Sequence, residues 1–348
     1  MRVMFELTYR CNFHCKHCYV PFSYRKYGEL KTKEVYSILD QLAEIGCFYL
    51  GLTGGEPFMR KDILKIIAYA KNKGFQIILY TNGSLIDKAV ARELGRLRLN
   101  KVDITIPGMS QKAFEAVSEV PGSRDRVFKA IDFLRQNRVA LGFKTCVLKD
   151  NQEEINQIQD FAASLGSLHR LDDRLSRKLD GSPEPYEFRG SLKEKTGILH
   201  KRRFNNDKDY ILKKNCDYDI VELKTNNLFK CGVGLSQAAI TPQGELKPCL
   251  MIEEPKYKIK VIRQSETEEK RLSLLMAWDK IKGFVSSLAP DSDYKCATCD
   301  LRVYCKWCPA KGWLSSGSLL MPDSECYQAA GVLKKRTINE GERVVVHG

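Results

Sequence analysis

Short apolar runs alternate with amphipathic stretches along the first half of the chain. A typical run is RVMFEL at 2–7, and a typical stretch is TKEVYSILDQLAEIG at 32–46, where apolar residues recur every three or four positions. The runs predict strands and the stretches predict helices. The predicted strands cover 2–7, 48–53, 75–81, 101–106, 139–148 and 167–172. The predicted helices cover 32–46, 61–74, 85–97, 124–137 and 151–166, the last with Asn151 as its N-cap.

Regular alternation of strands and helices predicts parallel strands joined by right-handed crossovers. About six such units predict an α/β fold, a partial (βα)6 barrel that stays open where an eight-unit barrel would close. Chemistry in barrels of this kind gathers at the carboxyl ends of the strands. The loop that follows the first strand is therefore the first place to look for a site.

The second half of the chain has a different character. GSPEPYEFRG at 181–190 is rich in turn residues, and the basic stretch after it has only weak helical periodicity. AAITPQGELKPCL at 238–250 predicts a hairpin that turns at Gln243–Gly244, and residues 267–288 predict a helix. We therefore expect a core at 1–172, a bridging region at 173–225, and a cysteine-rich domain with a tail at 226–348.

Composition narrows the class of protein. The chain starts MRVMFELTYR without the apolar run of a signal peptide, and no stretch approaches the ~18 apolar residues of a membrane span, which predicts a cytoplasmic protein. In that compartment 13 cysteines favour metal or redox chemistry over disulfides. The net charge of +14 indicates either a solvated basic surface or a docking face for an acidic peptide. Without a nucleic-acid motif, we expect no nucleic-acid partner.

Three cysteines follow the first predicted strand at a compact spacing. Cys11, Cys15 and Cys18 form a C-x3-C-x2-C run within TYRCNFHCKHCYV. Three thiolates cannot complete a structural zinc site, which needs four ligands. They suit three irons of a cubane cluster and leave the fourth iron open for a ligand that can chelate.

This run resembles the signature of the radical S-adenosylmethionine (SAM) superfamily. The resemblance implies a 4Fe-4S cluster on Cys11, Cys15 and Cys18, with the amino and carboxylate groups of SAM on the fourth iron. LTGGEP at 52–57 resembles the family's second motif, at the end of the second strand. It implies that Glu56 offers a carboxylate to the methionine ammonium, and that glycines let the backbone approach the ligand closely. The residues concerned are Gly54, Gly55, Glu56 and Pro57.

Further positions carry over from the same family. The resemblance implies that Tyr19 presents its backbone to the adenine, and that Thr81 and Asn82 in YTNG touch the adenosine. An ordinary strand-to-helix turn is the alternative for YTNG. Thr105 replaces the family's serine toward the ribose, although Ile106-Pro107 departs from the family pattern.

Other cysteines and histidines near these motifs have simpler explanations. We expect Cys47 and Cys146 to be packing thiols. His14 and His17 lie among the cluster ligands, where loop packing is the simpler explanation.

The resemblance also implies the reaction that the family performs with its cluster and SAM. A reduced cluster passes one electron to the sulfonium, and the resulting 5′-deoxyadenosyl radical takes a hydrogen atom from the substrate. The electron implies a flavodoxin- or ferredoxin-type reductant. The protein must keep water and competing groups away from so reactive a species.

A second group of cysteines resembles the SPASM extension of radical SAM enzymes, which binds two auxiliary 4Fe-4S clusters. In the family's arrangement Cys231, Cys249 and Cys308 hold one cluster. The other is held by Cys296, Cys299, Cys305 and Cys326. Only Lys306 and Trp307 separate the last pair, where the family usually has three residues.

The first auxiliary cluster lacks a fourth ligand in this pattern. Cys216 is the candidate, and an open iron that could bind substrate is the alternative. A pair of zinc sites is the alternative for the whole cysteine group.

The resemblance implies a peptide or protein side chain as substrate, modified by a crosslink or an oxidation, as in the maturation of ribosomal peptides. The early start of the core predicts that a leader peptide is recognised by this body or by a separate partner protein. One candidate surface is the basic group Lys193, Lys195, Lys201, Arg202, Arg203, Lys213 and Lys214.

Other functions stay open. Maturation of a haem-type or other small-molecule cofactor precursor is one alternative. A non-catalytic electron-transfer protein is another, although it would not need GGEP. Thr53 and Leu250 stand where sulfatase-maturing relatives carry glutamine and aspartate, which disfavours that activity.

Overall fold

The computed structural model describes residues 1–172, 175–190, 228–229, 231–261, 273–288, 294 and 308–321. The chain forms two compact units. One is made of Met1–Arg189 with Val233–Val285, and the other of Gly190–Gly232 with Ser286–Gly348. Most of the described residues belong to the first unit, whose fold positions the predicted site.

The first unit is built on one sheet, with the strand order β6-β5-β4-β3-β2-β1-β7-β8-β9. Neighbouring strands are parallel from β6 to β7, whereas β8 is antiparallel to both β7 and β9. The strands are β1 (Arg2–Glu6), β2 (Tyr49–Thr53), β3 (Gln76–Thr81), β4 (Lys101–Thr105), β5 (Leu141–Cys146), β6 (Leu168–Asp172), β7 (Gln237–Ile240), β8 (Glu245–Lys247) and β9 (Ile259–Lys260).

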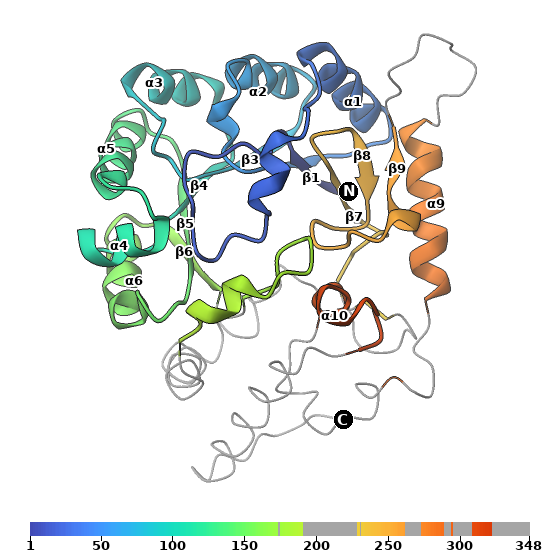
Figure 1. The fold of residues 1–348 in the computed structure, drawn as a ribbon. Helices are drawn as coiled ribbons and strands as arrows, with labels where there is room; N and C mark the ends of the chain where they lie inside the picture. Colours follow the sequence, from blue (N-terminus) through green and yellow to red (C-terminus); the bar gives the residue numbers. More distant parts are fainter. Residues whose placement is uncertain are drawn as a thin grey trace, which may run out of the picture. The chain divides into compact units, whose positions relative to one another are not determined.

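Helices follow the outer side of the curved sheet (Figure 1). They are α1 (Thr32–Glu44), α2 (Ile63–Asn72), α3 (Lys88–Leu97), α4 (Gln111–Ser118), α5 (Ser123–Gln136) and α6 (Ile155–Ser164). Alternate strand residues such as Val3, Phe5 and Leu52 are completely buried, and the alternation along the paired strands places them on one face of the sheet. An open α/β arrangement of six parallel strands and their crossover helices confirms the predicted partial barrel.

The opposite face of the sheet is the interior of the barrel. A Cβ atom added to Gly51 would lie 2.4 Å from the Met4 sulfur and 3.2 Å from the Tyr80 ring, so these three residues share that face. Glu6, Asp103 and Lys144 follow the same alternation along their strands. The interior is therefore partly polar, whereas the helix side is apolar.

The six predicted strands and five predicted helices of the first half are confirmed. The sequence analysis missed α4, a helix of 8 residues whose N-cap Ser110 accepts a hydrogen bond from the Ala113 amide.

Asn151 is at an N-cap position as predicted, but its side chain makes no capping bond. This residue precedes the short 3-10 helix η3 (Gln152–Glu154). Its side chain instead accepts a hydrogen bond from the Leu148 amide and donates to Pro107 O. The amide therefore ties two loops together, a role that local sequence does not reveal.

The predicted hairpin at 238–250 is confirmed as β7 and β8, with Gly244 at φ +77° in the turn. It does not stand apart from the barrel, because β7 pairs in parallel with β1 and extends the sheet. The helix expected at 267–288 is α9 (Leu274–Ser287) where the structure describes it, and 267–272 lie outside the described residues. The Leu274 amide donates to the side chain of Gln41 on α1, so α9 packs beside the barrel.

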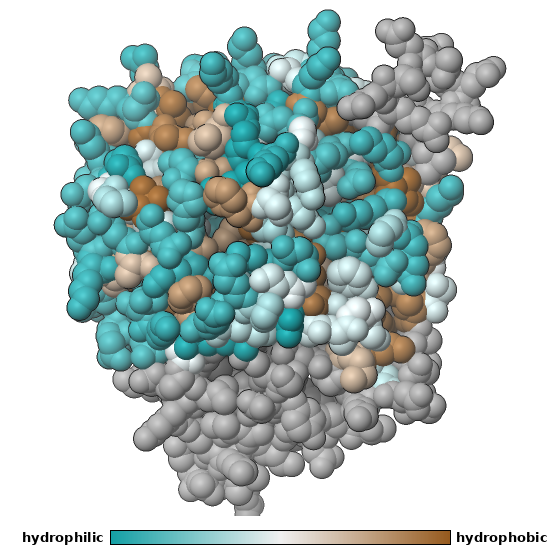
Figure 2. Space-filling view, viewed as in Figure 1, coloured by the Kyte–Doolittle hydropathy of each residue, from teal (hydrophilic) through white to brown (hydrophobic). Residues whose placement is uncertain are grey.

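The visible surface of the described residues is mostly hydrophilic, with hydrophobic residues in separate groups (Figure 2). Within the same residues, no helix has the length and apolar composition that a membrane crossing requires.

Candidate active site

The loop with Cys11, Cys15 and Cys18 leaves the end of β1 and crosses the mouth of the barrel (Figure 1). It is held on two sides by backbone hydrogen bonds. The amides of Gly55 and Glu56 donate to Thr8 O and Arg10 O at 2.7 and 2.8 Å. Farther along, the amides of His14 and Lys16 donate to the carbonyl oxygens of Ser118 and Val117 at the end of α4, each at 3.1 Å. The helix that the sequence analysis missed therefore anchors the cysteine loop.

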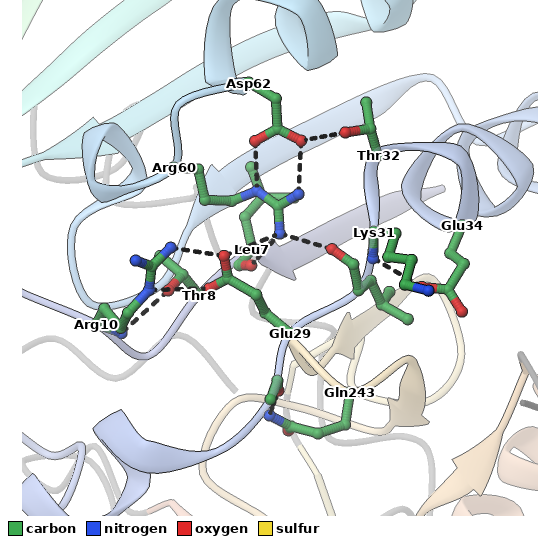
Figure 3. A network of polar contacts seen from close by, with 12 residues as sticks. Leu7, Thr8, Arg10, Glu29, Lys31, Thr32, Glu34, Arg60, Asp62 and Gln243 are labelled. Atoms are coloured by element: carbon green, nitrogen blue, oxygen red, sulfur yellow. Dashed lines mark hydrogen bonds and ion pairs between the residues drawn. The ribbon is translucent and has the colours of Figure 1, made fainter.

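A buried arginine fastens both ends of this loop (Figure 3). Arg60 is 4% exposed, and its guanidinium donates to Leu7 O at 3.2 Å and to Leu30 O at 2.9 Å. Two further bonds reach the carboxylate of Asp62 at 3.0 and 2.7 Å. Because Leu7 precedes the cysteines and Leu30 follows them, one side chain fixes where the loop leaves and rejoins the fold.

Partial burial works to raise the pKa of Asp62, but hydrogen bonds from Arg60 and Thr32 outweigh it and lower that pKa below its ordinary value. Asp62 therefore stays ionised and complements the arginine. No sequence motif predicted a role for Arg60. The only feature that could have drawn attention to it is its position between GGEP and the start of α2.

The two glycines of GGEP are needed for contact with the cysteine loop. Gly54 has φ +142°, and a Cβ atom there would lie 2.2 Å from Thr8 O. A Cβ atom on Gly55 would lie 2.4 Å from Arg10 O. This close contact presses the GGEP turn onto the start of the loop, and the approach of the glycines to a ligand stays a prediction.

Glu56 joins this turn to the end of β3. Its carboxylate is completely buried and accepts hydrogen bonds from Thr81 Oγ1 at 2.7 Å, the Asn82 amide at 2.7 Å and the Phe58 amide at 3.1 Å. Burial raises the pKa of Glu56, and these donors work against that rise. These contacts show that Glu56 connects the GGEP turn to the TNG turn at the end of β3. Its binding of the methionine ammonium stays a prediction.

A side-chain network then connects β3 back to the cysteine loop. Asn82 Nδ2 donates to Asn12 Oδ1 at 2.9 Å and lies 3.9 Å from the sulfur of Cys11. Asn12 Nδ2 donates to Ser84 Oγ at 2.9 Å. Arg25 supports the same loop by donating to Cys11 O at 3.0 Å and to Phe13 O at 2.5 Å. The structure therefore brings Asn82 to Cys11, and it ties Thr81 to Glu56 of the GGEP turn. Their contacts with the adenosine stay predictions.

The cysteine loop offers three thiols as ligands. Burial raises the pKa of Cys11 to about 11 and raises the pKa values of Cys15 and Cys18 as well, so thiolates here need the charge of a metal centre. In the described part of the chain, no three His, Cys, Asp or Glu side chains converge on a position for one metal ion. A cubane asks for a different geometry, because each thiolate binds its own iron. Three cysteine thiolates from one loop are a donor set that a 4Fe-4S cluster takes.

A buried charged network lies beside the third cysteine. Tyr19 Oη and Tyr9 Oη each donate to the carboxylate of Glu6 at 3.2 Å. Lys247 Nζ lies 3.7 Å from Glu6 Oε2 and 2.5 Å from Glu253 Oε1, and Lys247 and Glu6 are completely buried. Burial works to lower the pKa of Lys247, but the two carboxylates outweigh it and raise that pKa, so the ammonium stays charged.

Three further residues were predicted to contact SAM, namely Tyr19, Pro57 and Thr105. Tyr19 O already accepts a bond from the Leu179 amide at 2.8 Å, and Pro57 is buried at the start of the 3-10 helix η2 (Pro57–Met59). Thr105 ends β4 on the interior side, next to Lys144 of β5. Their contacts with SAM stay predictions.

The two cysteines and two histidines that were expected to serve only in packing have different surroundings. Cys47 is 5% exposed and packs as predicted. Cys146 is partly buried against Val117 and Leu148. His14 stacks on Phe22, with ring centroids 5.8 Å apart, whereas the Nδ1 atom of His17 has no hydrogen-bond partner in the described ranges.

The second cysteine group is only partly described. Cys231, Cys249 and Cys308 are partly exposed. The sulfur of Cys249 accepts a bond from the Met251 amide at 3.4 Å, and Cys308 precedes α10 (Pro309–Ser316). Cys216, Cys296, Cys299, Cys305 and Cys326 lie outside the described residues, as does the basic group between 193 and 214. The auxiliary clusters therefore stay a prediction.

Comparison with known proteins agrees with this geometry. Residues 5–162 match the model of the Radical SAM superfamily. This stretch contains the cysteine loop, the GGEP turn and the β3 end that the contacts above join. This part of the chain is a radical SAM domain.

Individual relatives extend over most of the chain. An AdoMet-dependent heme synthase of Oleidesulfovibrio alaskensis is 26% identical over 93% of this chain and 86% of its own length. Mycofactocin maturase MftC of Mycobacterium ulcerans is 25% identical over 94% of this chain and 87% of its own length. For several other curated relatives, the matched region spans about half of their length.

Solved structures show the same fold. Streptococcus suis SuiB bound to its precursor peptide SuiA has a TM-score of 0.69 at 16% identity, over 93% of this chain and 75% of SuiB. At this identity the likeness concerns the fold alone.

Proposed function

We propose that the protein cleaves SAM reductively and abstracts a hydrogen atom from the side chain of a peptide or protein. The observation that carries the proposal is the hydrogen-bonded unit in which Arg60, Glu56 and Asn82 hold the cysteine loop against the GGEP and TNG turns. When bound, a 4Fe-4S cluster and SAM supply one-electron chemistry that ends in a 5′-deoxyadenosyl radical.

Each part of the chain has a defined task in this proposal. Cys11, Cys15 and Cys18 hold the cluster. The GGEP and TNG turns, with Thr105 and the backbone of Tyr19, bind and orient SAM. Arg60 and Glu56 fix the distance between these parts, which matters because radical transfer depends on precise placement of the reacting atoms.

A peptide or protein substrate is supported by two likenesses. MftC, which resembles this chain over most of its length, is named a maturase, and the solved SuiB structure holds a precursor peptide. The net charge of +14 suits an acidic leader segment, whose long-range attraction salt would screen. In this proposal the modification is a crosslink or an oxidation, and the basic group between 193 and 214 or a separate partner protein recognises the leader.

A haem precursor is the second candidate substrate. The match to an AdoMet-dependent heme synthase covers as much of this chain as the match to MftC, at nearly the same identity. Such a substrate carries several carboxylates, which the positive charge of the chain would also attract.

We also propose two auxiliary clusters, a cytoplasmic location and a flavodoxin- or ferredoxin-type reductant. The division into a core at 1–172, a bridge at 173–225 and a cluster domain at 226–348 belongs to the same proposal. The cysteine spacing from Cys231 onward supports the clusters, and Cys216 is the candidate eighth ligand.

The test is a single-turnover assay with anaerobically reconstituted protein, dithionite and SAM. 5′-Deoxyadenosine should form, and an acidic peptide encoded beside the enzyme should lose a pair of hydrogen atoms. The protein with Cys11, Cys15 and Cys18 changed to alanine should form none. Formation of 5′-deoxyadenosine by that variant would refute the assigned cluster site. Conversion of a haem precursor instead of the peptide would refute the peptide substrate and leave the radical reaction in place.

A further inference from the structure

An aromatic and basic surface lies directly after the cysteine loop. It is formed by the 3-10 helix η1 (Phe22–Lys26) and by Tyr27, which follows it. Phe22 is 60% exposed and Tyr27 is 51% exposed, and Lys26 is exposed as well. We call the surface made by Phe22, Arg25, Lys26 and Tyr27 the η1 face. Large rings that face solvent at one place are a feature of sites where a protein partner docks.

The exposed rings of the η1 face are held in place by packing. The ring of Tyr27 stacks on Tyr24, with centroids 4.7 Å apart, and Tyr24 packs against the buried Tyr9 at 5.6 Å. The guanidinium carbon of Arg25 lies 4.7 Å from the centre of the Phe22 ring. Side chains fixed in this way lose little conformational freedom when a partner covers them, and aromatic residues and arginine are the common anchors of interfaces.

The segment that contains the η1 face carries positive charge only. Between Glu6 and Glu29 the chain has no acidic residue, and its lysines and arginines there are Arg10, Lys16, Arg25 and Lys26. Arg10 pairs with Glu29, and Lys16 pairs with Asp150. Arg25 and Lys26 form no ion pair with any residue that the structure describes. An acidic partner would therefore meet two uncompensated cations beside exposed rings.

The η1 face is in direct contact with the cysteine loop. Arg25 donates hydrogen bonds to Cys11 O at 3.0 Å and to Phe13 O at 2.5 Å. One hydrogen bond therefore separates a cation of this face from the backbone of a predicted cluster ligand. A protein that covers the η1 face lies beside the predicted cluster.

We propose that the η1 face is the docking site of the protein that supplies the electron for SAM cleavage, an acidic carrier of the flavodoxin or ferredoxin type. In the docked complex the carrier is oxidised by one electron, and that electron reduces the cluster on Cys11, Cys15 and Cys18. Complexes for electron transfer are small and transient, and complementary charge brings their partners together quickly. This inference rests on the proposed function, because only the reduction of a cluster at these cysteines requires a carrier to dock here.

An acidic substrate peptide is the other partner that the charge of the η1 face would attract. The contacts favour the electron carrier, because the hydrogen bond from Arg25 to Cys11 O places the face next to the predicted cluster. That proximity matters for the transfer of an electron, whereas a leader peptide does not need it.

The test compares Lys26→Glu with the native protein, both reconstituted with iron and sulfide, and uses a bacterial flavodoxin as the probe. Titration calorimetry measures the affinity for oxidised flavodoxin at low and at high salt. Formation of 5′-deoxyadenosine is measured with reduced flavodoxin and with dithionite. Charge reversal should weaken flavodoxin binding by about 10-fold at low salt and by less at high salt. The rate with dithionite, which needs no docking face, should stay the same.

A second variant tests the aromatic part of the face. Phe22→Ser removes a ring that is 60% exposed. It should weaken flavodoxin binding by about fivefold at both salt concentrations, because salt does not screen an apolar contact. Melting temperature and iron content show whether each variant is folded and loaded.

A matched control separates docking from a general change in charge. Lys65→Glu makes the same change at an exposed position of α2. It should leave the affinity for flavodoxin and both rates unchanged. Equal losses in Lys26→Glu and Lys65→Glu would overturn a specific role for the η1 face.

The remaining outcomes also decide the matter. Unchanged flavodoxin affinity in either Lys26→Glu or Phe22→Ser overturns the proposal. So does weaker binding of a glutamate-rich peptide with unchanged flavodoxin binding, since that result assigns the face to the substrate. A native protein that accepts electrons from neither flavodoxin nor a bacterial ferredoxin, but reacts with dithionite, overturns it as well. Failure to form 5′-deoxyadenosine with dithionite would refute the proposed function instead, and calorimetry measures docking separately.

Discussion

At the scale of residues, single buried side chains hold the site together. Arg60 joins the start and the end of the cysteine loop through Leu7 O and Leu30 O, and it is neutralised by Asp62 (Figure 3). Gly54 allows the GGEP turn to lie against Thr8. Both residues act on the loop that carries the three cysteines, so they act on the chemistry through the position of that loop.

Replacing Arg60 by methionine should lower the free energy of unfolding by about 3 kcal/mol, because two carbonyls and a carboxylate lose a buried donor. Iron retention at the first cluster should fall with it. Urea unfolding and iron analysis measure both quantities. Arg10→Met is the control, since Arg10 is 44% exposed and its pair with Glu29 should contribute less than about 1 kcal/mol. Equal effects of the two changes would contradict the anchoring role.

Asp62 should make stability depend on pH in a defined direction. Its pKa is lower in the folded protein than the ordinary value of 3.8. The ionised form is thus favoured by folding, so the contribution is present above the unfolded pKa and disappears as pH falls through the folded pKa. The difference in urea midpoint between the native protein and Asp62→Asn should shrink as pH is lowered below about 4. A difference that grows on acidification would be the opposite result.

Gly54→Ala should weaken both folding and cluster binding. A non-glycine residue at φ +142° is strained, and the new Cβ atom would meet Thr8 O. We expect a loss of about 2 kcal/mol or more in urea unfolding. Gly28→Ala is the matched control, because a Cβ atom there would contact nothing within 4 Å.

At the scale of elements, the hairpin β7–β8 is attached to the first strand by a charged pair as well as by sheet hydrogen bonds. Lys247 on β8 faces Glu6 at the end of β1, and Glu6 in turn holds Tyr19, the neighbour of Cys18. Two residues beyond Lys247 comes Cys249. One buried network therefore positions the loop of the first cluster and a predicted ligand of an auxiliary cluster relative to each other.

Removing only one member of this network should be costly. Lys247→Met leaves Glu6 and Glu253 buried without their cation and should lower the free energy of unfolding by about 3–5 kcal/mol. The double variant with Glu6→Gln should recover part of that loss, because the uncompensated charge at Glu6 is removed. A double-mutant cycle in urea measures the coupling. Additive losses would mean that the two residues do not interact.

At the scale of the whole molecule, the two cysteine groups predict the metal content. Ten motif cysteines support three cubanes, so reconstituted protein should bind about twelve irons, and the protein lacking Cys11, Cys15 and Cys18 about four fewer. Iron and zinc analysis measures this directly. Zinc at the C-terminal cysteines, with about four irons in the native protein, would contradict the auxiliary clusters.

The order of strands and helices was predictable because hydrophobic periodicity is a local property of the chain. The six strands and the crossover helices of the barrel followed from it, as did the hairpin turn at Gly244. The short helix α4 was missed because eight residues give too little periodicity to recognise. Its importance came from a contact far along the chain, with His14 and Lys16.

By itself, the sequence determined the cysteine spacing, the GGEP turn and the succession of secondary structures, since each depends on neighbouring residues. Only the tertiary structure decided that Arg60 fastens the cysteine loop, that Glu56 bonds to β3, and that β7 lies beside β1. It also decided that Lys144 of β5 lies over the Tyr80 ring of β3, 5.1 Å from the ring centre. The physical reason is that the partners of a buried polar group are distant in sequence, and they come together only when the whole sheet is assembled.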